Sequence, residues 1–362
     1  MASHGVPRPS SSRLARTGQA RAKELAKIEE YRNLVALVQE KMVEKDYTTA
    51  TLSQITALLT LNPEYSTIWN YRRLILTHLL HSPNSKPQPL LQTDLKFLLP
   101  LHLTHPKAYT LYTHRHWLLQ QSLLLLPASS SLPIFISELA LCSTLLSRDP
   151  RNFHGWGYRR LVSEELVGMM REKGGEVVEA EFDYANRMVE ANLSNFSAWH
   201  ARAAWGIRVL DVRRADASER LRFFENELSL ITRALYTDPY DQSLWFYHTY
   251  LLLTTCSPKS PPSPSPSRKS ITTLTPPQKS HYLAQTLATL RDLLDSGDVE
   301  DCKWVFEALV VYGRMIGRVD PGRRDGGVGE EEVMGWLGKL EVLDPLRAGR
   351  WKDWKRGVGV LE

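Results

Sequence analysis

The chain has 362 residues, 43% of them hydrophobic and 23% charged, which is the composition of a globular protein that buries a core. Lys and Arg exceed Asp and Glu by a net charge of +5, a surplus too small and too diffuse for a nucleic-acid-binding protein. The three cysteines lie far apart and form no C-x-x-C pair, so the sequence encodes neither a disulfide framework nor a zinc knuckle, and we expect a cytoplasmic protein.

The first part of the chain carries no targeting or membrane signal. Residues 1–20 are basic and lack the apolar stretch of a secretory signal, which predicts a flexible N-terminal tail. Further on, the Leu-rich stretch Leu118–Leu126 is interrupted by polar residues, so no apolar run reaches the roughly 18 residues that span a bilayer. We therefore expect no transmembrane segment.

Residues 21–255 contain a recurring motif, and one further copy lies near the end of the chain. The copies begin at Asn62, His105, Asp149, Asn192, Asp238 and Asp344. Their intervals are 43, 44, 43 and 46 residues, followed by a gap of 106 that has room for one degenerate unit. Seven residues after each start stands an aromatic side chain: Trp69, Tyr112, Trp156, Trp199, Trp245 and Trp351. A period in the forties indicates a solenoid of helical hairpins.

Each repeat predicts two helices. An amphipathic stretch such as Leu52, Ile55, Leu58 and Leu59 precedes the motif with the spacing of one helical face, and we name it helix A. The Asn-Pro or Asp-Pro that follows ends helix A, because the residue before proline is disfavoured in the α region. Helix B then carries the aromatic residue and, three positions later, an arginine, both expected to serve the scaffold.

The second half of the chain adds an insertion and more helical pairs. Residues 256–280 are rich in Pro and Ser and predict a disordered insertion, because they cannot bury enough apolar surface to order themselves. Residues 281–362 predict further helical pairs that end in the motif at Asp344.

The commonest self-contained active sites are missing from the sequence. It has no Walker loop, no G-x-G-x-x-G after a strand, no G-x-S-x-G and no H-E-x-x-H, and its eleven histidines are scattered. His114 and His116 would project from opposite sides of one helix, which disfavours a metal pair. Residue patterns alone therefore predict a helical scaffold whose chemistry, if any, is shared with a partner.

The repeat itself resembles that of the protein prenyltransferase α subunits, in which Asn/Asp-Pro-x-aromatic-x-x-x-Trp-x-Tyr-Arg recurs at about the same spacing. The segments 152–160, 192–200, 241–248 and 344–353 look most like the α subunit of Rab geranylgeranyltransferase (type II), of the fungal type without extra domains. The resemblance implies an all-α, right-handed α-α superhelix, a crescent solenoid of about six to seven hairpins.

The resemblance also implies a shared activity. The chain would form an obligate heterodimer with a β subunit that holds the catalytic zinc, and this chain alone would bind no cofactor. The complex would transfer geranylgeranyl from geranylgeranyl diphosphate to C-terminal cysteines of Rab GTPases presented by a Rab escort protein.

One catalytic segment is expected from this chain. Pro106-Lys107-Ala108-Tyr109 matches the family's Pro-Lys-x-Tyr segment, which implies that Lys107 binds the isoprenoid diphosphate and that Lys107 and Tyr109 are catalytic. An ammonium near a helix N-terminus would stabilise the negative charge that develops on the leaving diphosphate. We expect no metal ligands here, except that His4 resembles an N-terminal histidine of the family that could reach the partner's zinc as a self-inhibitory ligand.

Two alternatives remain open from the sequence. The chain could be an α subunit shared by CaaX farnesyltransferase and type I geranylgeranyltransferase, which substrate preference would distinguish. It could also be a non-catalytic helical-repeat adaptor, although the common tetratricopeptide repeat has a period of about 34 residues and a different signature.

Overall fold

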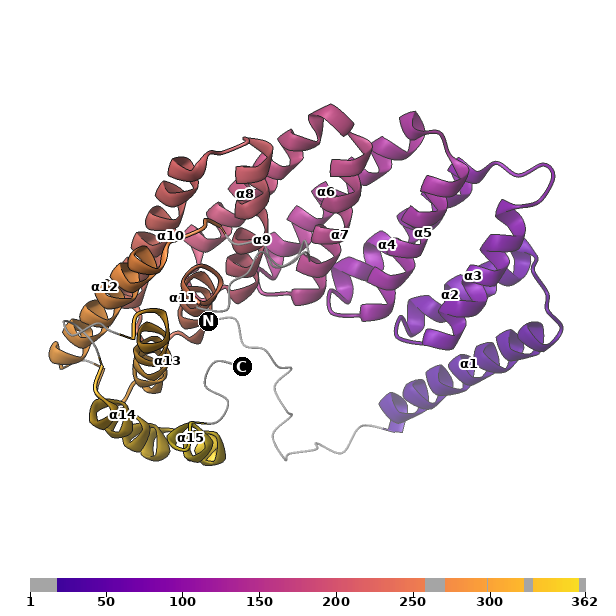
Figure 1. Ribbon diagram of the computed structural model, residues 1–362. Coiled ribbons are helices and arrows are strands. Elements are labelled where there is room, and N and C mark those ends of the chain that lie inside the picture. Colours follow the sequence, from indigo (N-terminus) through magenta and orange to yellow (C-terminus); the bar gives the residue numbers. More distant parts are fainter. Residues whose placement is uncertain (1–17, 258–270, 298, 322–327, 358–362) are drawn as a thin grey trace. The chain divides into compact units, whose positions relative to one another are not determined.

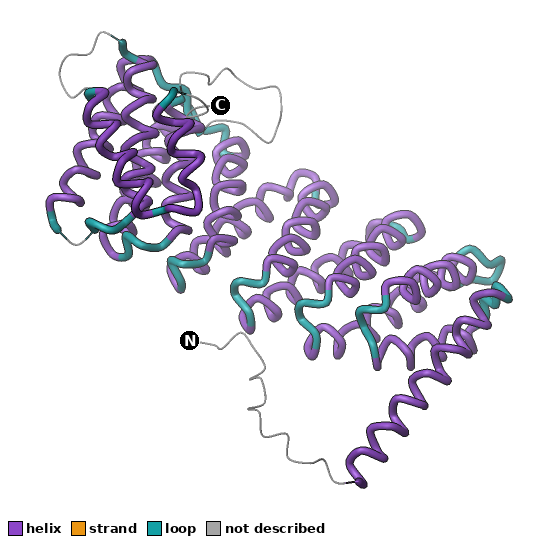
Figure 2. Tube along the Cα trace, turned by 90° about the horizontal axis from the view of Figure 1, so that it is seen from below, coloured by secondary structure: helices purple, strands orange, loops and turns teal. Residues whose placement is uncertain are grey.

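The computed structural model describes residues 18–257, 271–297, 299–321 and 328–357, and Figure 2 shows helices and loops in them but no strand. Fifteen α-helices occupy this part of the chain, which confirms the all-α class (Figure 1). They are α1 (Gly18–Val43), α2 (Thr49–Leu61), α3 (Ser66–Leu80), α4 (Pro87–Thr104), α5 (Tyr109–Leu125), α6 (Ala128–Arg148), α7 (Phe153–Met169), α8 (Gly174–Ala191), α9 (Phe196–Val212), α10 (Ala217–Thr237), α11 (Gln242–Cys256), α12 (Pro276–Asp295), α13 (Lys303–Val319), α14 (Glu330–Leu343) and α15 (Ala348–Lys355).

The chain divides into two compact units. Unit 1 comprises Met1–Arg148 with His154–Arg159, and unit 2 comprises Asp149–Phe153 with Arg160–Glu362. The boundaries predicted at residues 20, 255 and 280 rest on the composition of the sequence and not on contacts within the structure, so they stay predictions. Within the segment 256–280, residues 258–270 lie outside the described part of the chain, Ile271 and Leu274 are buried, and α12 begins at Pro276.

From α2 onward the helices alternate between the two predicted roles. Even-numbered helices are helix A and odd-numbered helices are helix B, so the described residues form seven hairpins, as expected. The long gap before Asp344 holds the degenerate unit, α12 and α13. Its helix B starts after Cys302, whose Sγ–H donates to the Pro239 carbonyl of the preceding motif at 3.1 Å.

The connection from helix A to helix B follows the chemistry of the motif. Asn62, His105 and Asp238 end their helices with φ of −139°, −127° and −146°, the extended backbone expected before proline. Asn192 adopts φ −158° although leucine follows it, so the fourth motif keeps the geometry without its proline. The connection is therefore specified by more than one feature of the repeat.

The aromatic side chains of five motifs close this connection with a hydrogen bond. Buried Trp69 donates its indole N–H to the Pro63 carbonyl at 2.7 Å. The same bond joins Trp199 to Leu193 at 2.8 Å and Trp245 to Pro239 at 2.7 Å, while Trp351 donates to the first residue of its motif, Asp344, at 3.2 Å. Tyr112 replaces tryptophan in the second motif, and its hydroxyl donates to the Pro106 carbonyl at 2.8 Å. The substitution thus conserves the bond.

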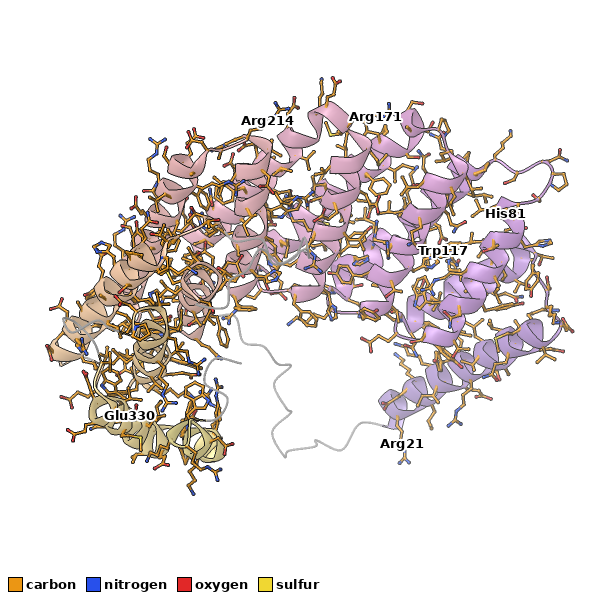
Figure 3. The ribbon with its side chains drawn as sticks, in the orientation of Figure 1. Arg21, His81, Trp117, Arg171, Arg214 and Glu330 are labelled. Carbon is orange, nitrogen blue, oxygen red and sulfur yellow. The ribbon has the colours of Figure 1, made fainter. Side chains whose placement is uncertain are left out.

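Two connections from helix B to the next helix A contain a residue with a left-handed backbone conformation. After α9, Arg214 has φ 52°, the Ala215 amide donates to the Leu210 carbonyl, and the Arg214 amide donates to the Asp211 carbonyl, which together form a Schellman motif. Arg171, with φ 47°, follows α7; Figure 3 labels it and Arg214 at the turns that lead out of these two helices. Helix A of the next hairpin follows each turn.

Buried acids on helix A join neighbouring hairpins, which the sequence analysis did not predict. In unit 1, Asp94 accepts hydrogen bonds from Arg72 of the preceding hairpin (Nε–Oδ1 3.0 Å) and from His114 of its own hairpin (Nε2–Oδ2 2.6 Å). Glu138 accepts in the same way from Arg115 and from Tyr158, each at 2.6 Å. We call each such set of a carboxylate with its two donors a rung.

The charge state of the first rung follows from its burial. Burial alone would raise the pKa of Asp94, but the hydrogen bond from His114 and the charge of Arg72 lower it to about 2. Burial lowers the pKa of His114 to about 4, although Asp94 opposes this. At neutral pH the rung therefore holds an ionised Asp94 and a neutral His114 that donates through Nε2.

Unit 2 contains the same arrangement and shows where it stops. Glu227 accepts from Arg202 at 2.8 and 2.5 Å and from the Tyr247 hydroxyl. One hairpin later, His248 replaces the arginine and its Nδ1 lies 2.8 Å from the hydroxyl of Tyr312 on α13. Since α12 buries no acidic residue, the series of rungs ends at α11.

Helix α6 is the most apolar long helix of the described residues. By length and composition alone it could cross a membrane. In unit 1, however, seven of its residues are buried, and one of them is Glu138 of the second rung. This is the packing of a helix inside a folded unit, so length and composition are weak evidence for a span.

Candidate functional site

The structure places Lys107 in the turn between α4 and α5, two residues before the first turn of α5. Its side chain is exposed. The turn is held on both sides: Pro106 accepts from Tyr112, and Thr110 Oγ1 donates to the Pro63 carbonyl of the preceding motif at 2.6 Å. The backbone that carries Lys107 is therefore fixed to two hairpins.

The position of Lys107 favours an anion. The N-terminus of a helix carries partial positive charge and unsatisfied amides, and α5 is 17 residues long. An ammonium next to this end adds a full positive charge to it. The two together suit a phosphate or diphosphate group, as in other helix N-terminal anion sites.

Tyr109, the second predicted catalytic residue, is the first residue of α5 and is 64% exposed. Its ring lies 5.7 Å from the ring of His154, which also stacks on Tyr112 at 5.9 Å. Burial lowers the pKa of His154, so the imidazole is neutral at pH 7 and can accept or donate a hydrogen bond. Unit 1 thus brings His154 to the predicted site.

A second cation lies on the same side of unit 1. Arg73 of α3 interacts electrostatically with Tyr109, and burial lowers its pKa without neutralising it. Its guanidinium donates to Asn70 Oδ1 at 3.0 Å, while its Nε is buried without a hydrogen-bond partner. The candidate site therefore combines Lys107 and Tyr109 from the prediction with Arg73 and His154, which the sequence analysis missed.

The remaining predicted residue, His4, lies outside the described part of the chain. Among the residues that are described, no group of three or more His, Cys, Asp or Glu side chains could hold a metal ion. The candidate site is thus a cationic and aromatic surface at the start of α5, suited to binding and stabilising an anion.

Comparison with known proteins gives a consistent assignment. The family model described as "Protein prenyltransferase alpha subunit repeat" matches residues 50–79, 135–166, 178–204 and 224–255, each of which spans one motif. The geranylgeranyl transferase type-2 subunit alpha of Schizosaccharomyces pombe is 32% identical over 369 aligned residues, which cover 99% of each protein. The protein of the same name from Saccharomyces cerevisiae is 34% identical over 67% of this chain and 70% of its own length.

A solved structure supports the fold. The chain resembles one in a Candida albicans protein geranylgeranyltransferase-I complexed with GGPP, with a TM-score of 0.59 over 91% of both chains. At 18% identity this likeness shows the architecture alone. It does not favour the type I enzyme over type II.

Proposed function

Since the chain belongs to the family of geranylgeranyl transferase type-2 α subunits, we propose that it forms one half of a heterodimer that prenylates Rab GTPases. The complex takes geranylgeranyl from geranylgeranyl diphosphate and transfers it to C-terminal cysteines of a Rab that an escort protein presents. The observation that carries this proposal is the exposed Lys107 in a turn held at the N-terminus of α5.

The role of this chain in the reaction is electrostatic. As the bond between the isoprenoid and the diphosphate breaks, negative charge collects on the diphosphate oxygens. Lys107 and the amides at the start of α5 stabilise that charge in the transition state more than in the ground state. Arg73 adds positive charge on the same side, and Tyr109 and His154 supply hydrogen-bonding groups. The attacking thiolate and the zinc that would activate it belong to the substrate and to the β subunit.

Unit 2 offers a surface that suits the β subunit. Phe196 of α9 and Phe246 of α11 are 49% and 46% exposed, and their rings meet at 5.6 Å. The ring of Trp304 on α13 lies 6.0 Å from Phe246. Aromatic side chains at the surface of three consecutive B helices are the kind that anchor stable interfaces. The three free cysteines are buried, which suits the cytoplasmic location that we propose.

The test is isoprenoid transfer by this chain co-expressed with a candidate β subunit. An escorted Rab and a CaaX peptide are offered separately as acceptors. Transfer confined to the Rab supports the proposal, transfer to the CaaX peptide supports the farnesyl and type I alternative, and no transfer from a stable complex supports a non-catalytic adaptor.

Lys107→Ala then tests the proposed site. Loss of one electrostatic donor costs about 2.7–4 kcal/mol of transition-state stabilisation, so kcat should fall by about 10²–10³. Lys96→Ala is the matched control, since Lys96 is also an exposed lysine of unit 1 but lies on α4. Equal activity of the two variants would remove Lys107 from the mechanism.

A further inference from the structure

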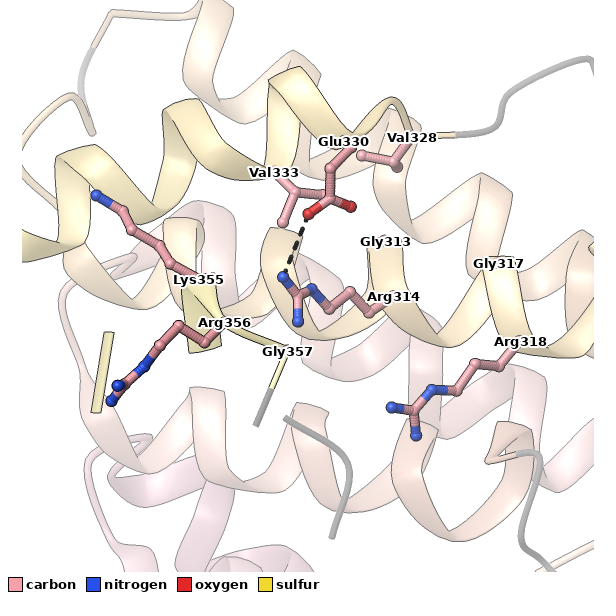
Figure 4. Close-up of a pocket in the computed structure, with 10 residues that line it drawn as sticks. All are labelled: Gly313, Arg314, Gly317, Arg318, Val328, Glu330, Val333, Lys355, Arg356 and Gly357. Atoms are coloured by element: carbon pink, nitrogen blue, oxygen red, sulfur yellow. Dashed lines mark ion pairs between the residues drawn. The ribbon is translucent and has the colours of Figure 1, made fainter. Parts of the chain in front are cut away.

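Unit 2 contains a cavity of about 470 Å³ that the proposed transferase activity does not use. Three segments border it: α13, the start of α14 with Val328 before it, and the end of α15 with the two residues that follow it (Figure 4). It is lined by Gly313, Arg314, Gly317, Arg318, Val328, Glu330, Val333, Lys355, Arg356 and Gly357. The volume lies in the range of small-molecule sites.

The charge of the lining is predominantly positive. Four of its side chains are basic and Glu330 is its single acid. Glu330 is 73% exposed and reaches Arg314 at 3.5 Å, the long ion pair drawn in Figure 4. Lys355 and Arg356 have one carboxylate partner each, Glu341 and Asp353, both outside the lining. A long, exposed ion pair contributes little, so an incoming anion can replace Glu330.

Two arginines retain unused donors. The Nε of Arg314 is buried and has no hydrogen-bond partner, which is costly for a charged group unless a ligand supplies an acceptor. Arg318, one turn later on α13, is exposed and makes no hydrogen bond or ion pair with the described residues. A guanidinium offers five N–H donors, and oxyanions accept them in pairs.

Two glycines line the cavity, and one of them borders open space. An ideal Cβ on Gly317 would meet no atom within 4 Å, so this position faces free space and not a packed neighbour. Gly313 lies one turn earlier on α13, where a Cβ would come within 3.2 Å of Val328. Because neither glycine carries a side chain, the backbone of α13 near Arg314 and Arg318 forms one wall of the cavity.

We propose that this cavity binds a phosphate-bearing group, with Arg314 and Arg318 as its principal donors and Lys355 and Arg356 at its edge. Phosphate fits better than a single carboxylate, because its additional oxygens and charge can engage the donors of Arg314 and Arg318 together. The group belongs either to a soluble phosphate compound or to a lipid headgroup. This binding is independent of the transferase function proposed above.

The experiment measures binding by the full chain with two probes. Pyrophosphate titrated in a calorimeter represents the soluble source and is measured in the Lys107→Ala background, which removes the candidate diphosphate site at α5. Co-sedimentation with phosphatidylcholine vesicles, with and without a phosphatidylinositol phosphate, represents the lipid source. Gly317→Leu fills the cavity with a residue of higher helix propensity, and its matched control is Gly335→Leu, an exposed glycine of α14 that also has no atom within 4 Å of its Cβ position. Arg318→Ala is matched by Arg233→Ala, an exposed arginine of α10.

We expect at least one probe to bind, Gly317→Leu to abolish that binding, and Arg318→Ala to weaken it about tenfold or more, while both controls bind as the unaltered chain does. Pyrophosphate binding with this pattern assigns a soluble ligand, and vesicle binding with this pattern assigns a lipid. Binding of neither probe, or binding that survives Gly317→Leu in a chain with an unchanged circular dichroism spectrum, would overturn the proposal.

Discussion

The second rung offers a direct test of what holds adjacent hairpins together. In Glu138→Gln the shape of the side chain is kept, but Arg115, which is 2% exposed, loses its counter-charge at 2.6 Å. Leaving one member of a buried ion pair without its partner costs about 3–5 kcal/mol. Tyr158→Phe removes one hydrogen bond to the same carboxylate and costs about 1.5–3 kcal/mol, because the acceptor is charged.

The two changes should not add. In the Glu138→Gln background the acceptor of Tyr158 is neutral, so Tyr158→Phe should cost only about 1 kcal/mol there. Urea denaturation followed by circular dichroism gives the free energy of unfolding for each variant. Glu44→Gln, which disrupts the surface pair with Lys41, is the control and should leave the urea midpoint unchanged. If Glu138→Gln costs less than about 1 kcal/mol, or if the two changes add, the rung is not the coupled unit described here.

Three further outcomes are expected. Tyr112→Phe should lower the free energy of unfolding by about 1 kcal/mol through loss of the bond to Pro106, whereas a neutral effect would show that the bond contributes nothing. His102 is buried with neither ring nitrogen hydrogen-bonded, and burial lowers its pKa to about 3 from 6.5. Between these pH values the folded state therefore binds fewer protons than the unfolded state, and its free energy of unfolding falls by about 1.4 kcal/mol per pH unit as pH falls. In urea denaturation at pH 7 and pH 5, His102→Leu should reduce the loss of stability between the two pH values. An unaltered loss would contradict this role of His102. Burial raises the pKa of Cys256 to about 12, so iodoacetamide should not modify it in the folded chain, and modification without unfolding would show that the thiol is accessible.

Much of the fold was readable because one signal repeats. The aromatic position of each motif fixed the position of helix B, and the preceding Asn, His or Asp marked the end of helix A. The degenerate unit could be predicted only as a gap in the repeat, since Phe306 stands where the other motifs have Trp or Tyr and Val299 stands at the motif's first position. Neither the composition of the chain nor the period of the repeat predicts where unit 1 ends and unit 2 begins.

The rungs were hidden in a pattern that could have been found. The acids of the three rungs, Asp94, Glu138 and Glu227, each stand eleven residues before the start of a motif. An acid on an otherwise apolar helix face is normally predicted to be exposed, because burial of a carboxylate is unfavourable unless hydrogen-bond donors surround it. Those donors come from a different hairpin, so the pairing becomes visible only when helices are aligned by repeat.

The candidate site also has a part that the sequence could predict and a part that it could not. Lys107 and Tyr109 were found through a short segment that resembles a family motif, which is local information. Arg73 and His154 belong to other hairpins, and their approach to Tyr109 depends on how neighbouring B helices pack. No spacing in the sequence encodes that approach, so only the structure could bring the four residues together.

The rungs also bear on how such a chain can change in length during evolution. The hairpin of α4 and α5 presents the acid Asp94 to the previous hairpin and Arg115 to the next one, so a duplicate of this hairpin would find matching partners on both sides. His248 and the acid-free buried face of α12 offer no such match. Tandem duplication is therefore compatible with the hairpin of α4 and α5, whereas the hairpins that follow α11 can grow only by changes that create new partners.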